Sequence, residues 1–242
     1  MTADRARSYP PAWTDNAVLV YGPRKGGTTL LLNLLDGSDA LFAFHAEDKT
    51  KFFHRWPESE ITRDRYVAES RVPELVHDGV PVDRYRELWQ QVDPAPFRGD
   101  LRALLRQDAW NMRRAAGHPP AEPAMWCAKD VGGKTHAIVA LWRRCFPGGR
   151  LVFILRDPRQ VARAVLNDRR RKSRRLSFLE IAREMADPMR VVAAQGAYLD
   201  DPDILPIAYE DLVADTAGTM QRIAGFLGVP YDEVFTRPTL FG

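Results

Sequence analysis

Short apolar runs recur along the chain, and longer segments with helical periodicity lie between them. Four runs of five residues are mostly apolar and are followed by polar residues, a pattern typical of buried strands. The strands that we expect are residues 17–21, 124–128, 151–155 and 204–208. The helices that we expect are residues 29–36, 100–116, 136–145, 158–169, 178–199 and 216–227.

This alternation predicts a single α/β domain over residues 1–242, with a central, mainly parallel sheet between two layers of helices. Residues 57–99 are rich in charge and proline. We interpret them as an insertion over the sheet edge, either a substrate lid or a simple helical connection. Ligands of parallel sheets bind at the carboxyl ends of the strands, so the residues that follow each strand are the candidates for a site.

A glycine-rich loop joins the first strand to the first helix. Its sequence is Gly22-Pro23-Arg24-Lys25-Gly26-Gly27-Thr28-Thr29. Gly22 and Gly27 have the spacing of a nucleotide-binding P-loop, but Thr28 stands where that motif has its lysine. The positive charge lies earlier, at Lys25. Because backbone N–H groups and a helix N-terminus still favour an anion here, the loop predicts a P-loop-like phosphate site, but not one for the β- and γ-phosphates of ATP.

The composition changes this picture little. The 242 residues are 45% hydrophobic and 28% charged, with a formal net charge of +3, which suits a globular enzyme for anionic ligands and does not demand nucleic acid. No apolar run is long enough to span a bilayer, and the first residues lack the apolar segment of a signal peptide. Cys127 and Cys145 have no metal-ligand spacing, so we expect two reduced, partly buried thiols in a cytoplasmic protein.

Further short motifs follow the later strands in a fixed order. The third strand leads into Arg-Asp-Pro at residues 156–158, the fourth into Tyr-Glu-Asp-Leu at residues 209–212, and Phe-Leu-Gly follows at residues 226–228. Together with the loop at residues 22–29, this ordered set resembles the PAPS-dependent sulfotransferase family, in particular the bacterial and Golgi-type domains with a Lys-Gly-Gly-Thr loop. PAPS is 3′-phosphoadenosine 5′-phosphosulfate.

The resemblance implies transfer of a sulfonate group from PAPS to a hydroxyl or amine of a small-molecule or carbohydrate acceptor, with no metal ion. Lys25 would stabilise the leaving phosphate, on which negative charge grows in the transition state. The N–H groups of Gly26, Gly27, Thr28 and Thr29 are implied to hold the 5′-phosphate beside it, and Arg24 is implied to bind the cofactor as well.

The same resemblance places Arg156 at the 3′-phosphate of PAPS and Tyr209 near the adenine. The alternative for Tyr209 is a core tyrosine with a hydrogen-bonded hydroxyl group. The family usually has a serine eight positions after the arginine, where this chain has Ala164, so one expected hydroxyl donor is missing. Arg163 or the basic run that follows it is the candidate to compensate.

An acceptor hydroxyl must lose its proton, which calls for a general base. Relatives with this loop place a glutamate ahead of a Phe-Phe pair, which points to Glu47 as the base. Asp48 and His45 are the next candidates for the base, and both are also expected to bind the acceptor. The alternative is that Glu47 is a surface carboxylate paired with a nearby lysine. Lys129 resembles a lysine of the family that lies near the acceptor and the sulfonate, with Lys134 as the rival match.

Two other features have a structural and a functional interpretation. The basic run at residues 169–175 is either a solvated surface segment or a rim that binds anions. Most of the tryptophans are most simply interpreted as core residues, although some could line an acceptor pocket. These tryptophans are Trp56, Trp89, Trp110, Trp126 and Trp142.

Two other functions remain open from the sequence. A small-molecule or nucleotide kinase would need a Walker lysine and a magnesium carboxylate, and Thr28 argues against it. A degenerate, non-catalytic sulfotransferase-like module could bind acidic glycans through the basic run. Nucleic-acid binding is disfavoured, because no RNP-like or helix-turn-helix pattern accompanies that run.

Overall fold

The computed structural model describes residues 13–43, 123–132, 135–171 and 177–239. Its strands are β1 (Ala17–Gly22), β2 (Leu41–Ala43), β3 (Met125–Val131), β4 (Arg150–Leu155) and β5 (Ile204–Ala208). Its helices are α1 (Thr28–Asp36), α6 (Thr135–Cys145), α7 (Pro158–Arg171), α8 (Phe178–Gly196), α9 (Tyr209–Ala214) and α10 (Thr216–Leu227), with two 3₁₀ turns, η1 (Trp13–Asp15) and η4 (Glu233–Thr236).

The five strands form one parallel sheet in the order β2-β3-β1-β4-β5. β1 lies in the middle, and all six of its residues are buried, as expected of a strand covered on both faces. The α/β class and the parallel sheet predicted from the sequence are therefore confirmed. α1 leads from β1 to one side of the sheet and α6 leads to β4 on the other, so the loop after β1 lies where the connections diverge.

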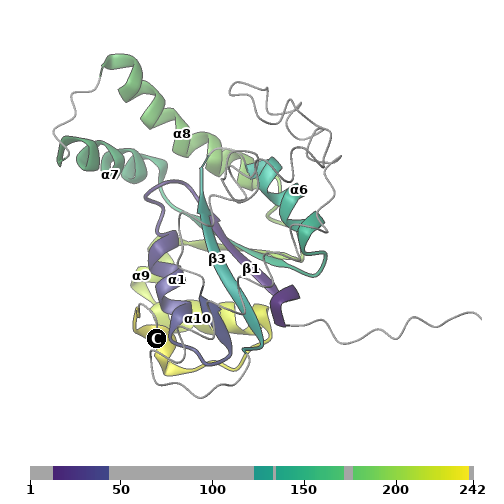
Figure 1. Cartoon of the computed structure of the whole chain (residues 1–242). Coiled ribbons are helices and arrows are strands. Elements are labelled where there is room, and N and C mark those ends of the chain that lie inside the picture. The colour runs from purple at the N-terminus through teal and green to yellow at the C-terminus, as the bar shows by residue number, and fades with distance from the viewer. Residues whose placement is uncertain (1–12, 44–122, 133–134, 172–176, 240–242) are drawn as a thin grey trace, which may run out of the picture.

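Helices cover the sheet on both faces (Figure 1). α1, α9 and α10 lie on one side, where leucines of α1 and apolar residues of α10 pack on β1 and β4. α6 and α8 lie on the other side, where Trp126, Trp142 and Phe146 form an aromatic cluster with ring centroids 4.7 to 5.8 Å apart. Both cysteines are fully buried thiols outside any disulfide, where partial burial was expected.

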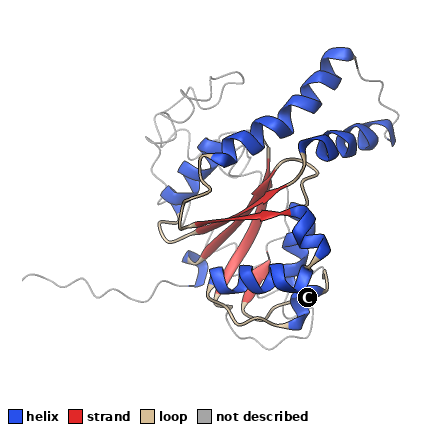
Figure 2. Cartoon of the chain, turned by 180° about the vertical axis from the view of Figure 1, so that it is seen from behind, coloured by secondary structure: helices blue, strands red, loops and turns tan. Residues whose placement is uncertain are grey.

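α7 and α8 form a helical hairpin that extends beyond the carboxyl end of the sheet, as the view from behind also shows (Figure 2). A mostly buried ion pair joins the two helices: Arg169 donates from Nη2 to Glu184 Oε1 at 2.8 Å. α8 begins with a capping box between Ser177 and Glu180. No helix in the described part of the chain combines the length and apolar character needed to cross a bilayer.

The predicted elements differ from the observed ones mainly at their ends. α1 begins one residue earlier than predicted, α7 continues to Arg171 and α8 ends at Gly196. Besides the two 3₁₀ turns, two short elements were not predicted: β2, which has three residues, and α9, which begins directly at the end of β5. The predicted helix at residues 100–116 and the predicted lid at residues 57–99 lie outside the described residues.

Candidate functional site

The loop at residues 22–29, which we call the phosphate loop, leaves β1 through a tight turn. The N–H group of Gly26 donates to the Pro23 carbonyl at 2.8 Å. Lys25 takes the third position of this turn with φ 62°, a conformation that type II turns usually give to glycine or asparagine. The strained backbone sets the direction in which the Lys25 side chain leaves the loop.

Gly27, within the phosphate loop, is the N-cap residue of α1. Its φ is 106°, and a Cβ atom placed on it would lie 2.4 Å from Cδ2 of Tyr209. Glycine is therefore required both by the backbone and by the close approach of a ring. Since Gly27 has no side chain to cap the helix, the first N–H groups of α1 lack a side-chain acceptor and suit an anion.

Arg156 leaves the end of β4 and crosses to the phosphate loop. It donates from Nη1 to the Lys25 carbonyl at 2.8 Å, and its guanidinium carbon lies 4.1 Å from the centre of the Tyr209 ring. The Arg156 Nε atom is buried and has no hydrogen-bond acceptor among the described residues. A buried guanidinium N–H group without an acceptor is uncommon and fits a site that an anion completes.

The Arg-Asp-Pro and Tyr-Glu-Asp motifs meet at this edge of the sheet. Asp157 accepts hydrogen bonds from the backbone and the side chain of Arg159, and these bonds hold the pKa of Asp157 below its usual value. The Asp157 N–H group donates to Glu210 Oε1 at 3.3 Å. The two motifs thus fix the start of α7 against the start of α9 and so place Arg156 and Tyr209.

The Lys25 ammonium turns towards α7. Its Nζ lies 3.3 Å from Oδ1 of Asp168, a residue that the sequence analysis did not select. The Lys25 side chain is 41% exposed and that of Asp168 is 20% exposed. Asp168 lies one helical turn after Ala164, on the same face of α7.

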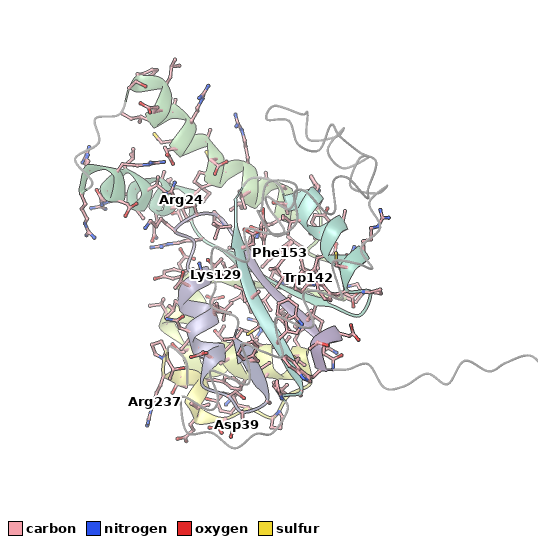
Figure 3. All side chains as sticks on the ribbon, in the orientation of Figure 1. Arg24, Asp39, Lys129, Trp142, Phe153 and Arg237 are labelled. Carbon is pink, nitrogen blue, oxygen red and sulfur yellow. The ribbon has the colours of Figure 1, made fainter. Side chains whose placement is uncertain are left out.

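Lys129 and Asp130, neighbours at the end of β3, face opposite sides of the sheet. Lys129 is 7% exposed and lies on the α1 side; Figure 3 shows it near the start of α1 together with Arg24, far from Asp39 beyond the other end of that helix. Asp130 pairs in register with Tyr21, whose ring packs on Phe153 on the α8 side. Burial raises the pKa of Asp130 to about 7.

Residues of the phosphate loop, together with Lys129, Arg156, Asp168 and Tyr209, line a cavity of about 490 Å³ at the carboxyl end of the sheet. We call it the donor cavity. Its volume is in the range of small-ligand sites. Four cationic side chains and one carboxylate, that of Asp168, line it among the described residues. The lining residues are Arg24, Lys25, Gly27, Thr28, Thr29, Leu30, Lys129, Val131, Arg156, Asp168 and Tyr209.

Most of the residues selected from the sequence thus meet at one place. Gly26 is the exception among the described ones, because it is buried and its N–H group is used within the turn. His45, Glu47 and Asp48 lie outside the described residues, as do Lys134, Trp56, Trp89 and Trp110. Trp126 and Trp142 are core residues, as expected. In the basic run, Arg169 is held in its pair with Glu184, and the described Arg170 and Arg171 are exposed.

Comparison with known proteins agrees with this geometry. A family model described as the sulfotransferase family matches residues 17–233. The chain belongs to the sulfotransferase family. Among curated protein sequences, none matches this sulfotransferase-family protein significantly.

Solved structures of sulfotransferases share its fold. The sulfotransferase domain from the curacin biosynthetic pathway has a TM-score of 0.53 at 16% identity, covering 96% of this chain and 79% of that domain. The sulfotransferase domain of the Synechococcus PCC 7002 olefin synthase has a TM-score of 0.52 at 17% identity, covering 96% and 78%. A sulfotransferase from Mycobacterium avium has a TM-score of 0.52 at 17% identity, covering 94% and 67%.

Proposed function

We propose that this sulfotransferase-family protein transfers a sulfonate group from PAPS to a hydroxyl or amine group of a small-molecule or carbohydrate acceptor, leaving adenosine 3′,5′-bisphosphate (PAP). The main support is the donor cavity, which Lys25 of the phosphate loop and Arg156 both line, with Arg156 hydrogen-bonded to the Lys25 carbonyl. The buried Nε–H group of Arg156, which has no protein acceptor among the described residues, fits the phosphate of such a donor.

Most polar residues that line the cavity then have a role that their chemistry allows. The first N–H groups of α1 and the hydroxyl groups of Thr28 and Thr29 hold the 5′-phosphate. Lys25 stabilises the charge that grows on the leaving phosphate, and Arg156 binds the 3′-phosphate while it stacks on Tyr209. Lys129 adds positive charge beside the sulfonate.

Tyr209 supports the site through its ring as well. The ring closes one side of the donor cavity, contacts Gly27 and carries the Arg156 guanidinium. Arg24 also lines the cavity. Burial raises the pKa of Asp187 on α8, and the nearby charge of Arg24 acts in the opposite direction. Ala164 supplies no hydroxyl donor, so Arg156 carries most of the 3′-phosphate binding.

Binding and turnover test the proposal together. By isothermal titration calorimetry, PAP should bind and ATP with Mg²⁺ should not, because the loop lacks the Walker lysine. Wild-type protein should convert PAPS to PAP with a panel of alcohols, phenols and amines. Lys25→Ala should lower the turnover by about a hundredfold and weaken PAP binding at least about tenfold.

A matched control removes a charge far from the site. Arg222→Ala on α10, where the arginine is exposed, should change neither PAP affinity nor turnover. Binding of ATP with Mg²⁺ in place of PAP would favour a kinase. Glycan binding that survives Lys25→Ala, without any turnover of PAPS, would favour a non-catalytic module.

A further inference from the structure

A second cavity lies on the outer side of the helical hairpin, between α7 and α8. Its volume is about 400 Å³, and we call it the hairpin groove. Successive residues of a helix are about 100° apart, so most of the α7 residues in this groove lie on the face away from Asp168, which lines the donor cavity. The lining residues are Arg159, Ala162, Arg163, Leu166, Asn167, Arg170 and Met185.

The hairpin groove combines apolar walls with arginine side chains. An alanine and a leucine of α7 and a methionine of α8 supply the apolar walls. Arg159 forms an ion pair with Asp157 at 2.8 Å. Arg163 and Arg170 are exposed, and neither forms an ion pair with another residue in the described part of the chain. These two guanidinium groups are therefore available to an anion from outside.

An exposed apolar stripe on α8 continues the hairpin groove. Phe178, Met185 and Met189 are spaced by seven and four residues, which places them on one face of the helix. Their exposed fractions are 82%, 50% and 61%. A row of large apolar side chains in water indicates a binding surface, whereas single exposed apolar residues are ordinary. We call the groove and this stripe together the outer hairpin face.

The carboxylates of α7 and α8 lie away from the outer hairpin face. Asp168 lines the donor cavity, and Glu184 is held between the helices in its ion pair. Helical spacing places Glu180 and Asp187 on the side of α8 away from the apolar stripe, and Asp187 lies near the charge of Arg24, a residue of the donor cavity. The outer hairpin face is thus apolar and basic, which suits a partner that is apolar and anionic.

We propose that the outer hairpin face docks on the surface of an anionic lipid bilayer. Guanidinium groups bind phosphate through paired hydrogen bonds, and their aliphatic stems can lie along apolar surface. The hairpin projects beyond the sheet (Figures 1 and 2), so its apolar side chains lie on a protruding part of the molecule. A bilayer accepts protruding apolar side chains wherever they lie, whereas a folded protein partner would need a matching surface.

Vesicle co-sedimentation of the full 242-residue chain tests this docking. Vesicles of phosphatidylcholine alone are compared with vesicles that mix phosphatidylcholine and phosphatidylglycerol. Wild-type protein should bind the mixed vesicles at least about tenfold more tightly than the neutral ones, and this binding should weaken as salt is added. Docking does not depend on sulfonate transfer, since the donor cavity lies on the other side of α7.

Two double variants separate the contributions of charge and apolar surface. Arg163→Gln with Arg170→Gln should weaken binding to mixed vesicles at least about tenfold, because each arginine near an anionic surface contributes about fivefold. Phe178→Gln with Met189→Gln should weaken it by a similar factor, because apolar side chains no longer enter the bilayer interface. Circular dichroism should show both variants folded, since all four side chains are exposed.

The matched controls change the same kinds of side chain elsewhere. Arg222→Gln with Arg237→Gln removes two exposed charges, and Figure 3 shows Arg237 at the other end of the molecule from the hairpin. Leu199→Gln with Val213→Gln removes apolar side chains that are 47% and 56% exposed. Both controls should bind the mixed vesicles within about twofold of wild type, because their positions lie outside the docking surface.

A fluorescent label reports where the contact occurs. Cys127 and Cys145 are fully buried, so a cysteine introduced by Met189→Cys or Val213→Cys takes an environment-sensitive dye selectively. Mixed vesicles should shift the emission of the dye at position 189 to the blue. The dye at position 213 should not respond.

Three results would contradict membrane docking: equal binding to neutral and mixed vesicles, a loss of binding in either control as large as in its partner variant, or no response of the dye at position 189. Emission that is already shifted without vesicles would also contradict it, because another part of the chain or a second copy would then cover the face. Analytical ultracentrifugation would tell those two occupants apart.

Discussion

Gly27 is the tightest point of the phosphate loop, because its φ is 106° and the Tyr209 ring lies against its Cα. Gly27→Ala should weaken PAP binding at least about tenfold, since the loop or the ring must move. It should also lower the free energy of unfolding by about 1–3 kcal/mol. Calorimetry and urea titration measure the two effects.

The matched control for this prediction is Gly148→Ala. A Cβ atom on Gly148 would meet no atom within 4 Å, and its φ is not in the left-handed region. This variant should keep wild-type affinity and stability. Equal behaviour of the two alanine variants would show that the contact with Tyr209 does not constrain the loop.

The buried carboxyl group of Asp130 should make the stability of the protein depend on pH. Burial raises its pKa to about 7 from the ordinary 3.8, against the Val131 N–H bond and the Lys129 charge, which lower it. The folded state thus binds a proton that the unfolded state releases between these pH values. The free energy of unfolding should fall by a few kcal/mol as pH rises from about 4 to about 7.

Asp130→Asn should remove this part of the pH dependence and make the protein more stable than wild type at pH 8. Urea titrations at pH 5 and pH 8 measure it. A wild-type protein whose stability rises over this range, with the asparagine variant showing the same rise, would mean that Asp130 does not titrate in this way.

Single residues also show what the sequence could reveal of the site. Lys25 and Thr28 were found because a phosphate loop is a local pattern, complete within eight residues. Arg156 was found because it follows a strand directly. Asp168 was missed because its contact with Lys25 exists only after α7 packs beside the phosphate loop, and an aspartate within a helix carries no local sign of that contact.

At the scale of elements, the long buried strands were the easiest to predict. β1 and β4 are covered on both faces, so their sequences are continuous apolar runs. β2 escaped detection because three apolar residues do not define a period. α9 escaped because its first residues, Tyr209 and Glu210, were interpreted as polar residues that follow a strand and face a ligand, whereas they also begin a helix without a break.

The hairpin of α7 and α8 depends on a specific contact between the two helices. Arg169 and Glu184 are each about one-fifth exposed, so their ion pair is largely shielded from solvent. Arg169→Ala should lower the free energy of unfolding by about 1–3 kcal/mol, because a mostly buried Glu184 loses its partner. Hydrogen exchange along both helices should become faster.

Arg170→Ala is the control for the hairpin, because Arg170 is the exposed neighbour of Arg169 and has the same charge. Its stability should stay within about 0.5 kcal/mol of wild type. If both alanine variants lose the same stability, net charge and not the contact with Glu184 holds the hairpin.

At the scale of the whole molecule, the sheet separates two cores, and the donor cavity belongs to the α1 side of β3. Trp142 is fully buried in the aromatic cluster on the α6 side. Trp142→Ala should lower the free energy of unfolding by about 3–5 kcal/mol, a large part of the total for a domain of this size. At a temperature where the variant is still folded, its PAP affinity should stay within about twofold of wild type, because the sheet lies between the cavity and the lost ring. Thermal unfolding and calorimetry measure both, and a proportional loss of affinity would contradict this separation.

At Lys25, the residue that suits the backbone conformation and the residue that the reaction needs are different. With φ 62°, this position favours glycine, so Lys25→Gly should leave the melting temperature equal to or above that of wild type while it lowers sulfonate transfer about a hundredfold, as Lys25→Ala does. A directed-evolution campaign that selects only for heat resistance would then tend to discard the ammonium group, and selection must include turnover if it is to retain an active enzyme.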